Sequence, residues 1–148
     1  MSYSFIDNEY DFEELSDQSF PSNFDIRHTL SLGATYNKAP WLLSAGFNWR
    51  TGKPTTPLLP QAAAESSIDY GAPNSDRLDD YLRVDMSALF QLVTGPSTRL
   101  EAGISLWNIL DRENAINNYY RLNADGDAEE VIQRSLGFTP NLLCRFHF

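Results

Sequence analysis

The sequence predicts an all-β protein built from about six antiparallel strands. Five segments alternate between apolar and polar residues with a period of two, over seven to fourteen residues each, which is the pattern of a strand with two different faces. The connections between these segments alternate in length, and the three long ones are acidic. Helical spacing fits the segments poorly, because small and polar residues fall at every second position.

The first two full strands are predicted over Asp25–Asn37 and Trp41–Arg50, and Met1–Ile6 has the pattern of a strand end before them. One face of Asp25–Asn37 carries only apolar residues and His28, while small or polar residues and an arginine lie opposite. The second strand has the same division. Its apolar face consists of Trp41, Leu43, Ala45, Phe47 and Trp49.

Three more strands are predicted over Leu82–Leu92, Arg99–Leu110 and Ser135–Phe148. In the first and last of these, apolar residues hold every second position from end to end. In Arg99–Leu110 the alternation breaks near the end, where Trp107 falls on the polar side and Asn108 on the apolar side.

The charges are concentrated in the long connections. The chain has 11 Lys and Arg against 20 Asp and Glu, a formal net charge of −9. Three segments, Asp7–Phe24, Thr51–Asp80 and Asp111–Ile132, hold 17 of the acids and four of the bases, so they carry −13 against +4 for the rest. These segments are predicted to be long polar loops. The acidic balance disfavours a nucleic-acid partner, because phosphate binding needs clustered Lys and Arg.

Catalysis and a resident cofactor are not expected. The lone Cys144 excludes an internal disulfide framework and a cysteine-based metal cluster. The two histidines, His28 and His147, lie far apart on opposite strand faces, and no serine has a nucleophile-elbow context. Met1–Phe5 has neither the basic region nor the apolar core of a signal peptide, so either the chain is cytoplasmic or its true N-terminus is missing.

Two interpretations of the apolar strand faces compete. In a soluble sandwich or small barrel that binds a small ligand, the apolar faces point inward to a core. In a membrane barrel they point outward to lipid. No apolar run approaches the roughly 18 residues of a membrane-spanning helix, but that leaves a barrel open.

Three observations favour the membrane interpretation. The polar faces are rich in Gly, Ser, Thr and Asn and almost lack Lys, unlike a soluble exterior. The strands reach about ten residues, the length that a tilted strand needs to cross a bilayer. Short turns at Asn37–Pro40 and Val93–Thr98 alternate with long loops, as periplasmic turns and outer loops do in bacterial barrels. Trp41 and Trp49 are then ~20 Å apart along the membrane normal, which suits two interfacial aromatic girdles, although both could be core residues.

The strand count predicts that this barrel is incomplete. Six strands cannot close, since about eight are the minimum, and an open edge in lipid leaves backbone groups unpaired. We therefore expect a segment of a larger barrel, or association that closes it.

Five motifs resemble those of one protein family, both in their order along the chain and in their positions on the predicted strands. The chain is similar to the C-terminal barrel region of TonB-dependent outer-membrane receptors, particularly the Bacteroidetes type. The residues that carry this resemblance are Phe20–His28 (FPSNFDIRH), Trp49–Pro57 (WRTGKPTTP), Tyr81–Ser87 (YLRVDMS), Asn108–Asn114 (NILDREN) and the terminal strand that ends on Phe148.

The resemblance implies that residues 1–148 are the last part of a 22-stranded barrel with a plugged lumen, located in the bacterial outer membrane. It implies import of a large, scarce nutrient such as a siderophore, haem, cobalamin or an oligosaccharide. The implied partners are outer-membrane lipid, the rest of the barrel, a plug domain, and TonB–ExbB–ExbD acting through an N-terminal part that these residues lack. A C-terminal aromatic such as Phe148 is what such barrels usually present for insertion, and it joins the two tryptophans at the lipid interface.

Several side chains are candidates for ligand contact. Lumen-facing arginines could contact anionic cargo or the plug, but pairing with Asp25, Asp85, Glu101 or further neighbours is the favoured alternative. Outer-loop tyrosines could stack on a ligand, with loop packing as the commoner role. A calcium site at Asp125, Asp127 and Glu129 lacks the EF-hand spacing, so a solvated loop is favoured. The arginines are Arg27, Arg50, Arg83 and Arg145, and the tyrosines are Tyr10, Tyr70, Tyr119 and Tyr120.

Overall fold

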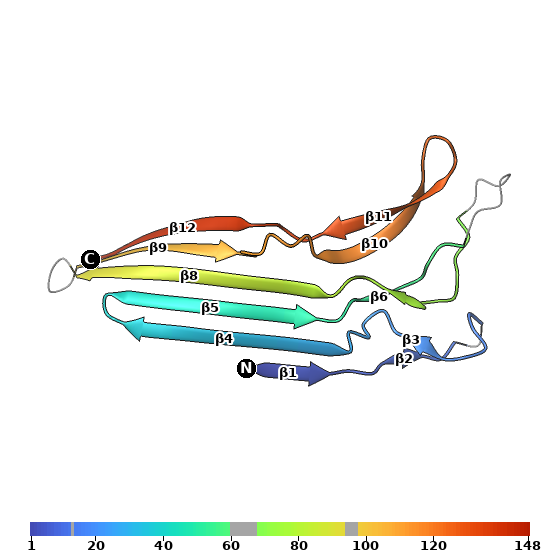
Figure 1. The fold of residues 1–148 in the computed structure, drawn as a ribbon, viewed down its shortest axis with the longest axis horizontal. Helices are drawn as coiled ribbons and strands as arrows, with labels where there is room; N and C mark the ends of the chain where they lie inside the picture. Colours follow the sequence, from blue (N-terminus) through green and yellow to red (C-terminus); the bar gives the residue numbers. More distant parts are fainter. Residues whose placement is uncertain (13, 60–67, 94–97) are drawn as a thin grey trace.

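One open antiparallel sheet forms the body of the protein, and the all-β prediction is confirmed. The computed structural model describes the chain except for residues 13, 60–67 and 94–97. No helix able to span a membrane is found in the described part. The sheet has the strand order β1-β4-β5-β8-β9-β12 (Figure 1). Its strands are β1 (Ser2–Phe5), β4 (His28–Lys38), β5 (Trp41–Arg50), β8 (Tyr81–Val93), β9 (Arg99–Trp107) and β12 (Thr139–His147).

The long acidic connections are more ordered than the sequence predicted. Each of them contains a two-stranded antiparallel hairpin where we expected only a polar loop. All three hairpins lie beyond the same end of the sheet, which we call the loop end (Figure 1). Their strands are β2 (Glu9–Tyr10) with β3 (Phe20–Pro21), β6 (Pro54–Thr55) with β7 (Asp76–Arg77), and β10 (Ala115–Leu122) with β11 (Ala128–Arg134).

The strand boundaries agree with the alternation, apart from the ends of some strands. β5 has the predicted bounds, whereas β4 begins at His28 and β12 at Thr139, each a few residues later than expected. β9 ends at Trp107, where the alternation breaks. Asn108 follows with a φ of 51°, a left-handed conformation that Asn tolerates better than most residues and that stops the strand.

The register places the apolar residues of neighbouring strands side by side. Ala45 of β5 pairs with Met86 of β8, and Met86 pairs with Leu106 of β9. On the opposite face, Ser44 pairs with Ser87, and Ser87 with Ser105. Because successive side chains point to opposite faces, the sheet has one continuous apolar face and one mostly polar face.

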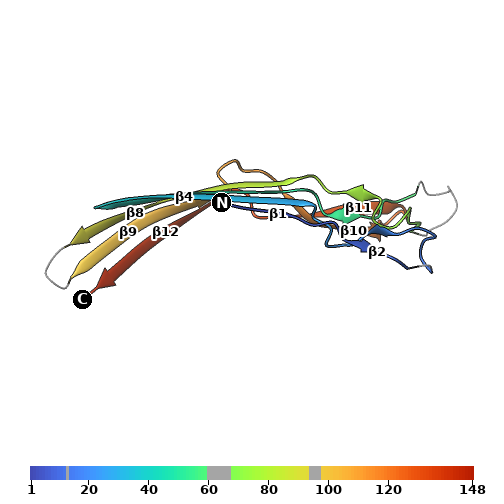
Figure 2. The same ribbon diagram turned by 90° about the horizontal axis from the view of Figure 1, so that it is seen from below.

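The apolar face is the more exposed of the two. Along β5, Trp41, Leu43 and Ala45 are exposed, whereas the intervening Leu42 and Ser44 are partly covered. The sheet is a single layer that bends along its length (Figure 2). No other described element packs over the apolar face in either view (Figures 1 and 2).

The buried side chains are mainly polar. Among the described residues, Phe20 is the one buried hydrophobic side chain. The most deeply buried side chains are Ser22, Asp25, Asn108 and Asn114, all at the loop end. The interior of this fold is therefore a polar region where strands pass into loops, rather than a hydrophobic core.

Candidate functional site

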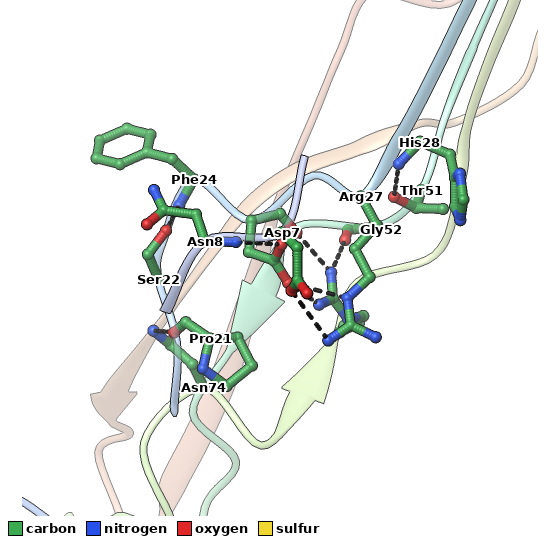
Figure 3. A network of polar contacts seen from close by, with 12 residues as sticks. Asp7, Asn8, Pro21, Ser22, Phe24, Arg27, His28, Thr51, Gly52 and Asn74 are labelled. Atoms are coloured by element: carbon green, nitrogen blue, oxygen red, sulfur yellow. Dashed lines mark hydrogen bonds and ion pairs between the residues drawn. The ribbon is translucent and has the colours of Figure 1, made fainter. Parts of the chain in front are cut away.

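The candidate site is the loop end of the sheet, and its first anchor is Asp25, just before β4. The Asp25 side chain is 1% exposed. Its carboxylate accepts hydrogen bonds from the Asn8 backbone N–H (3.2 Å) and Arg27 Nε (3.2 Å), and pairs with Arg77 of β7. Arg77 Nη1 also donates to the carbonyl oxygens of Asp25 (2.7 Å) and Gly52 (3.1 Å). One carboxylate thus ties together the segments before β2, before β4 and after β5 (Figure 3).

This bonding changes the acidity of Asp25. Burial alone would raise the pKa of the carboxyl group. The hydrogen bonds from Arg77 and Asn8, together with the nearby arginine charges, outweigh burial and hold the pKa below its ordinary value. Asp25 therefore remains a carboxylate at neutral pH, as its two arginine partners require.

Asn74 joins the first two loops a second time. It is buried, with a φ of 51°. Its Nδ2 donates to the Pro21 carbonyl oxygen (2.7 Å) and to Asn23 Oδ1 (2.8 Å). Its backbone N–H donates to Thr56 Oγ1 at 3.0 Å. The Asn74 side chain contacts the β3 segment directly (Figure 3).

Glycine is required at position 52 because the backbone of Leu78 lies too close to leave room for a side chain. A Cβ atom there would lie 1.6 Å from the carbonyl oxygen of Leu78, far inside contact distance. The Gly52 N–H donates to Asp80 Oδ1 (3.1 Å), and the other oxygen of Asp80 accepts from Trp49 Nε1 (3.2 Å). The chain leaving β5 therefore runs against the chain entering β8.

The third loop is anchored on β8 through two buried asparagines. The Asn108 N–H donates to Asp85 Oδ1 (2.9 Å), and its Nδ2 donates to the carbonyl oxygens of Arg112 and Leu136. The Asn114 side chain both donates to the Leu82 carbonyl and accepts from the Leu82 N–H, each at 2.9 Å. This pairing satisfies the backbone of Leu82 as a neighbouring strand would. We call Asp25, Asn74, Asn108 and Asn114, with these partners, the loop-base network.

The second and third loops also contact each other beyond the network. Lys53 Nζ donates to Asn117 Oδ1 at 3.0 Å, and the Tyr120 hydroxyl donates to the Thr56 carbonyl at 2.8 Å. The rings of Tyr70 and Tyr120 meet edge to face, with centroids 5.9 Å apart. Burial and the Glu130 carboxylate raise the pKa of Tyr120, so its phenol stays protonated.

A cleft of about 320 Å³ separates the β6–β7 and β10–β11 hairpins. That volume lies at the lower end of the range for small-molecule sites. Its walls contain apolar side chains, the Tyr120 ring and several charged groups from both hairpins. None of the sequence predictions identified this cleft, because it exists only where two hairpins meet.

Three of the four arginines that the sequence predicted to face the lumen lie beside acids. Arg83 makes a bidentate contact with Asp85 and lies over the Trp107 ring at 5.5 Å. Arg50 lies over the Tyr81 ring at 4.8 Å. The structure pairs Arg27 with Asp25 and Arg145 with Glu101 as well (3.2 Å each). Arg27, Arg83 and Arg145 are therefore paired with acids, whereas the contact found for Arg50 is with a ring. Contact of the four arginines with cargo or plug stays a prediction.

The four tyrosines do not form one cluster. Tyr10 packs against Phe12 and Phe20 in the first loop, with ring centroids 5.4 and 6.0 Å away. Tyr70 and Tyr120 face each other between the second and third loops, and Tyr119 is exposed on β10. Loop packing thus accounts for Tyr10, Tyr70 and Tyr120, and their stacking on a ligand stays a prediction.

The proposed girdle residues lie at opposite ends of the apolar face. Trp49 is near the loop end, where its ring stacks on His28 at 6.4 Å. Trp41 is at the turn end and packs edge to face against Phe90 at 4.9 Å. Phe148, just after β12, is fully exposed. The structure therefore adds His28 and Phe90 to the aromatic groups that the sequence placed at the two ends.

The acidic hairpin tip does not have the geometry of a metal site. Glu129 pairs with Arg121, and the backbone N–H groups of Asp125 and Asp127 both donate to Asn123 Oδ1 at 2.9 Å. Within the described residues, no group of three or more His, Cys, Asp or Glu is arranged to hold a metal ion. Asp125 and Asp127 lie in the turn of the hairpin and Glu129 lies in β11, and calcium binding by this segment stays a prediction.

Sequence reasoning placed Asp25, Asn108 and Asn114 of the loop-base network in family-like motifs without predicting their burial, and it missed Asn74. Asn108 and Asn114 are the ends of one motif, and the break in alternation at Asn108 was a usable signal. Asn74 and Asp80 gave no signal, because polar residues in a Pro- and Gly-rich segment are typical of any loop.

Comparisons with known proteins identify no relative. The chain matches no family model, no curated protein and no solved structure.

Proposed function

We propose that the chain is the C-terminal part of the β-barrel of an outer-membrane TonB-dependent receptor that imports a large, scarce nutrient. In this proposal the apolar face contacts lipid, and the polar face contacts the lumen and a plug domain. The three hairpins form outer loops that contact the cargo. Energy comes from TonB–ExbB–ExbD, through a part of the receptor outside these residues.

The observation that carries the proposal is the inverted distribution of side chains. Large apolar residues on the sheet, such as Trp41, Met86 and Leu142, are exposed, while the deepest side chains are polar. Soluble monomers rarely leave contiguous apolar patches of this kind uncovered. A lipid bilayer covers such a face without any further protein.

The positions of aromatic side chains and loops support the same proposal. Aromatic residues lie at both ends of the apolar face, as the two interfaces of a bilayer favour. The short connection at Lys38–Trp41 lies at one end of the sheet and all three hairpins lie at the other. That asymmetry is typical of outer-membrane barrels.

The five family-like motifs support the narrower assignment, because they contact one another at the loop end. Arg83-Val84-Asp85 meets Asn108 through the Asp85 carboxylate, and Val84 accepts a hydrogen bond from the Ile109 N–H at 2.9 Å. Asp25 meets Gly52 through Arg77. In this proposal the motifs attach the large loops to the ends of the barrel strands.

Cysteine labelling in cells tests the topology. In a Cys144→Ala background, single cysteines replace Asp125 in the third hairpin and Lys38 in the short turn of the complete gene product. We expect a membrane-impermeant maleimide to label Asp125→Cys on intact cells, and Lys38→Cys only after the outer membrane is permeabilised. Cys144→Ala without a new cysteine controls for background.

Two results would contradict the proposal. One is equal labelling of both positions on intact cells. The other is a gene product that purifies without detergent as a monodisperse monomer, which would instead favour a soluble barrel or sandwich that binds a small ligand.

A further inference from the structure

A buried charge lies on the polar face of the sheet, at Glu101 of β9. Glu101 is the one acidic residue of β9 and β12, two strands that the structure describes in full, and its side chain is only 8% exposed. Its carboxylate accepts hydrogen bonds from Gln91 Nε2 of β8 at 3.3 Å and from Arg145 Nη1 of β12 at 3.2 Å. His147 Nε2, also on β12, lies 3.7 Å from the carboxylate. One buried carboxylate therefore joins three neighbouring strands.

The strand register decides which side chain of β12 meets this carboxylate. Arg145 lies directly opposite Glu101 on one side, and Gln91 lies directly opposite it on the other. A shift of β12 by two residues would place Leu143 or His147 opposite Glu101 instead. Leu143 cannot neutralise a carboxylate, and His147 does so only when it is protonated. The observed register is therefore the one that gives Glu101 a permanent cation.

The alternation of apolar and polar residues does not by itself specify this register. A one-residue shift would turn every side chain of β12 to the wrong face, whereas a two-residue shift leaves each on its own face. Apolar residues would still meet apolar residues, because Leu100, Ala102 and Ile104 share one face of β9. No tight turn joins the two strands, since the third hairpin lies between them in the chain. The hydrogen bond from the Phe138 N–H to Asp111 Oδ1 (2.7 Å) holds the pair at the loop end, and Glu101 lies towards the other end (Figure 1).

We propose that the Glu101–Arg145 pair fixes the register of β12 against β9. A buried carboxylate without its cation is costly, so the pair penalises both two-residue shifts, even though an intact buried pair adds little net stability. Because β12 is the last strand in the sheet order, its register also decides which backbone groups its outer edge presents to a further strand. The inference goes beyond the proposed function, since the pairing of β12 with β9 does not depend on what covers the apolar face.

The native Cys144 can report this register through disulfide formation. Cys144 lies directly opposite Ala102, so Ala102→Cys creates a pair within disulfide reach. Leu100→Cys and Ile104→Cys lie diagonal to Cys144 and come within reach only when β12 shifts. Each substitution is made singly in the complete gene product, and the disulfide-linked peptides are quantified by mass spectrometry after mild oxidation. We expect Cys144 to link mainly to the cysteine of Ala102→Cys, and equal linkage at all three positions would contradict a fixed register.

Removal of the cation should shift the strand in one direction. In Arg145→Leu the carboxylate faces a leucine, and His147 is the remaining basic side chain beside it. A two-residue shift that places His147 opposite Glu101 also brings Cys144 opposite residue 104. We therefore expect the link through Ile104→Cys to rise about tenfold relative to the link through Ala102→Cys. An unchanged ratio would overturn the inference.

A matched control lies on the same face of the same strand. Asn141 donates a hydrogen bond to the Thr139 carbonyl oxygen and lies four residues from Arg145. Asn141→Leu therefore adds the same apolar side chain without removing the cation, and the ratio of links should stay as it is. An equal shift in Asn141→Leu and Arg145→Leu would contradict a specific role of the ion pair.

A double variant separates register from stability. Glu101→Leu combined with Arg145→Leu leaves no buried carboxylate unpaired, so resistance to denaturant should stay close to that of the original chain. The links through Leu100→Cys and Ile104→Cys should nevertheless rise severalfold, because nothing then penalises a two-residue shift. A double variant that links only through Ala102→Cys would show that the register is fixed without the pair, and would overturn the inference.

The experiment also separates this inference from the proposed function. A gene product with the outer-membrane labelling pattern, whose links do not change in the charge variants, removes the register inference alone. A detergent-free soluble protein whose links shift as expected removes the outer-membrane function and keeps the role of Glu101 and Arg145.

Discussion

The strand faces and the loop bases of this protein differ in what their side chains contact. On the central strands β5, β8 and β9, Leu43, Met86 and Ile104 of the apolar face are exposed, whereas the neighbouring serines of the polar face, Ser44, Ser87 and Ser105, are partly covered. At the loop bases, the fully buried side chains are polar, and those of Asp25, Asn108 and Asn114 make hydrogen bonds to other segments. The described residues leave the apolar face of the sheet uncovered, and the proposed function assigns lipid to cover it. The loop bases depend on directional hydrogen bonds within the chain.

The largest expected effect tests the sheet side of this comparison. Met86 lies in the middle of the apolar face, so in the proposed barrel Met86→Lys places a charge near the bilayer centre. We expect a loss of membrane-inserted stability of about 2–4 kcal/mol, measured by urea unfolding in lipid vesicles. Ser87→Lys, one residue further and on the polar face, is the matched control and should cost much less. Equal losses would mean that the two faces do not differ in environment.

The next effect tests the loop-base side with a pair of glycines. Gly52→Ala forces a Cβ onto the Leu78 carbonyl, and we expect a cost of about 2–3 kcal/mol from the backbone shift that follows. In Gly46→Ala on β5 the new Cβ meets no atom within 4 Å, so the cost should stay below about 1 kcal/mol. Denaturant unfolding of the two variants measures the difference. A tolerated Gly52→Ala would show that the two chain segments do not approach this closely.

A somewhat smaller effect is expected when a single network side chain is removed. Asn114→Ala leaves the N–H and C=O of Leu82 without the partners they now have, at a cost of about 1–2 kcal/mol. Limited proteolysis should then cut the β10–β11 hairpin faster, while the sheet stays protected. Asn123→Ala, at the exposed end of the same hairpin, should leave the base of the hairpin as protected as it is now.

The smallest expected effect is a dependence on pH. Because the folded pKa of Asp25 is below that of an unfolded carboxyl group, the unfolded state takes up the proton first. The stability that Asp25 contributes is complete above the ordinary carboxyl pKa of about 3.9 and is lost as the pH falls through the lower folded value. Proteolysis of the first loop should therefore accelerate below about pH 4.

Asp25→Asn separates this contribution from that of other acids. The variant should have a looser first loop at neutral pH and should lack the additional acid-induced loosening. If the variant and the original chain respond identically to acid, Asp25 does not hold the loop through its charge.

Much of the sheet was predictable because period-two alternation is a local property. Each strand needs only its own residues to have an apolar and a polar face, so the strands β4, β5, β8, β9 and β12 were found within a few residues of their bounds. Two hairpins were not found because β2–β3 and β6–β7 are two-residue strands with no alternation to detect. The third was not found because β10 and β11 carry apolar residues at adjacent rather than alternate positions. The loop-base pairings were not found either, since Asp25 meets Arg77 across 52 positions of the chain.

The sequence by itself determined the all-β class, the strands, their two faces and the concentration of charge in three connections. All of these follow from side-chain period and composition, which local backbone geometry translates directly into structure. Only the tertiary structure decided that the connections contain hairpins, that buried asparagines anchor them, and that a cleft lies between two of the hairpins. Those features depend on hydrogen bonds and contacts between residues far apart in the chain, whose partners become known only when the strands lie side by side.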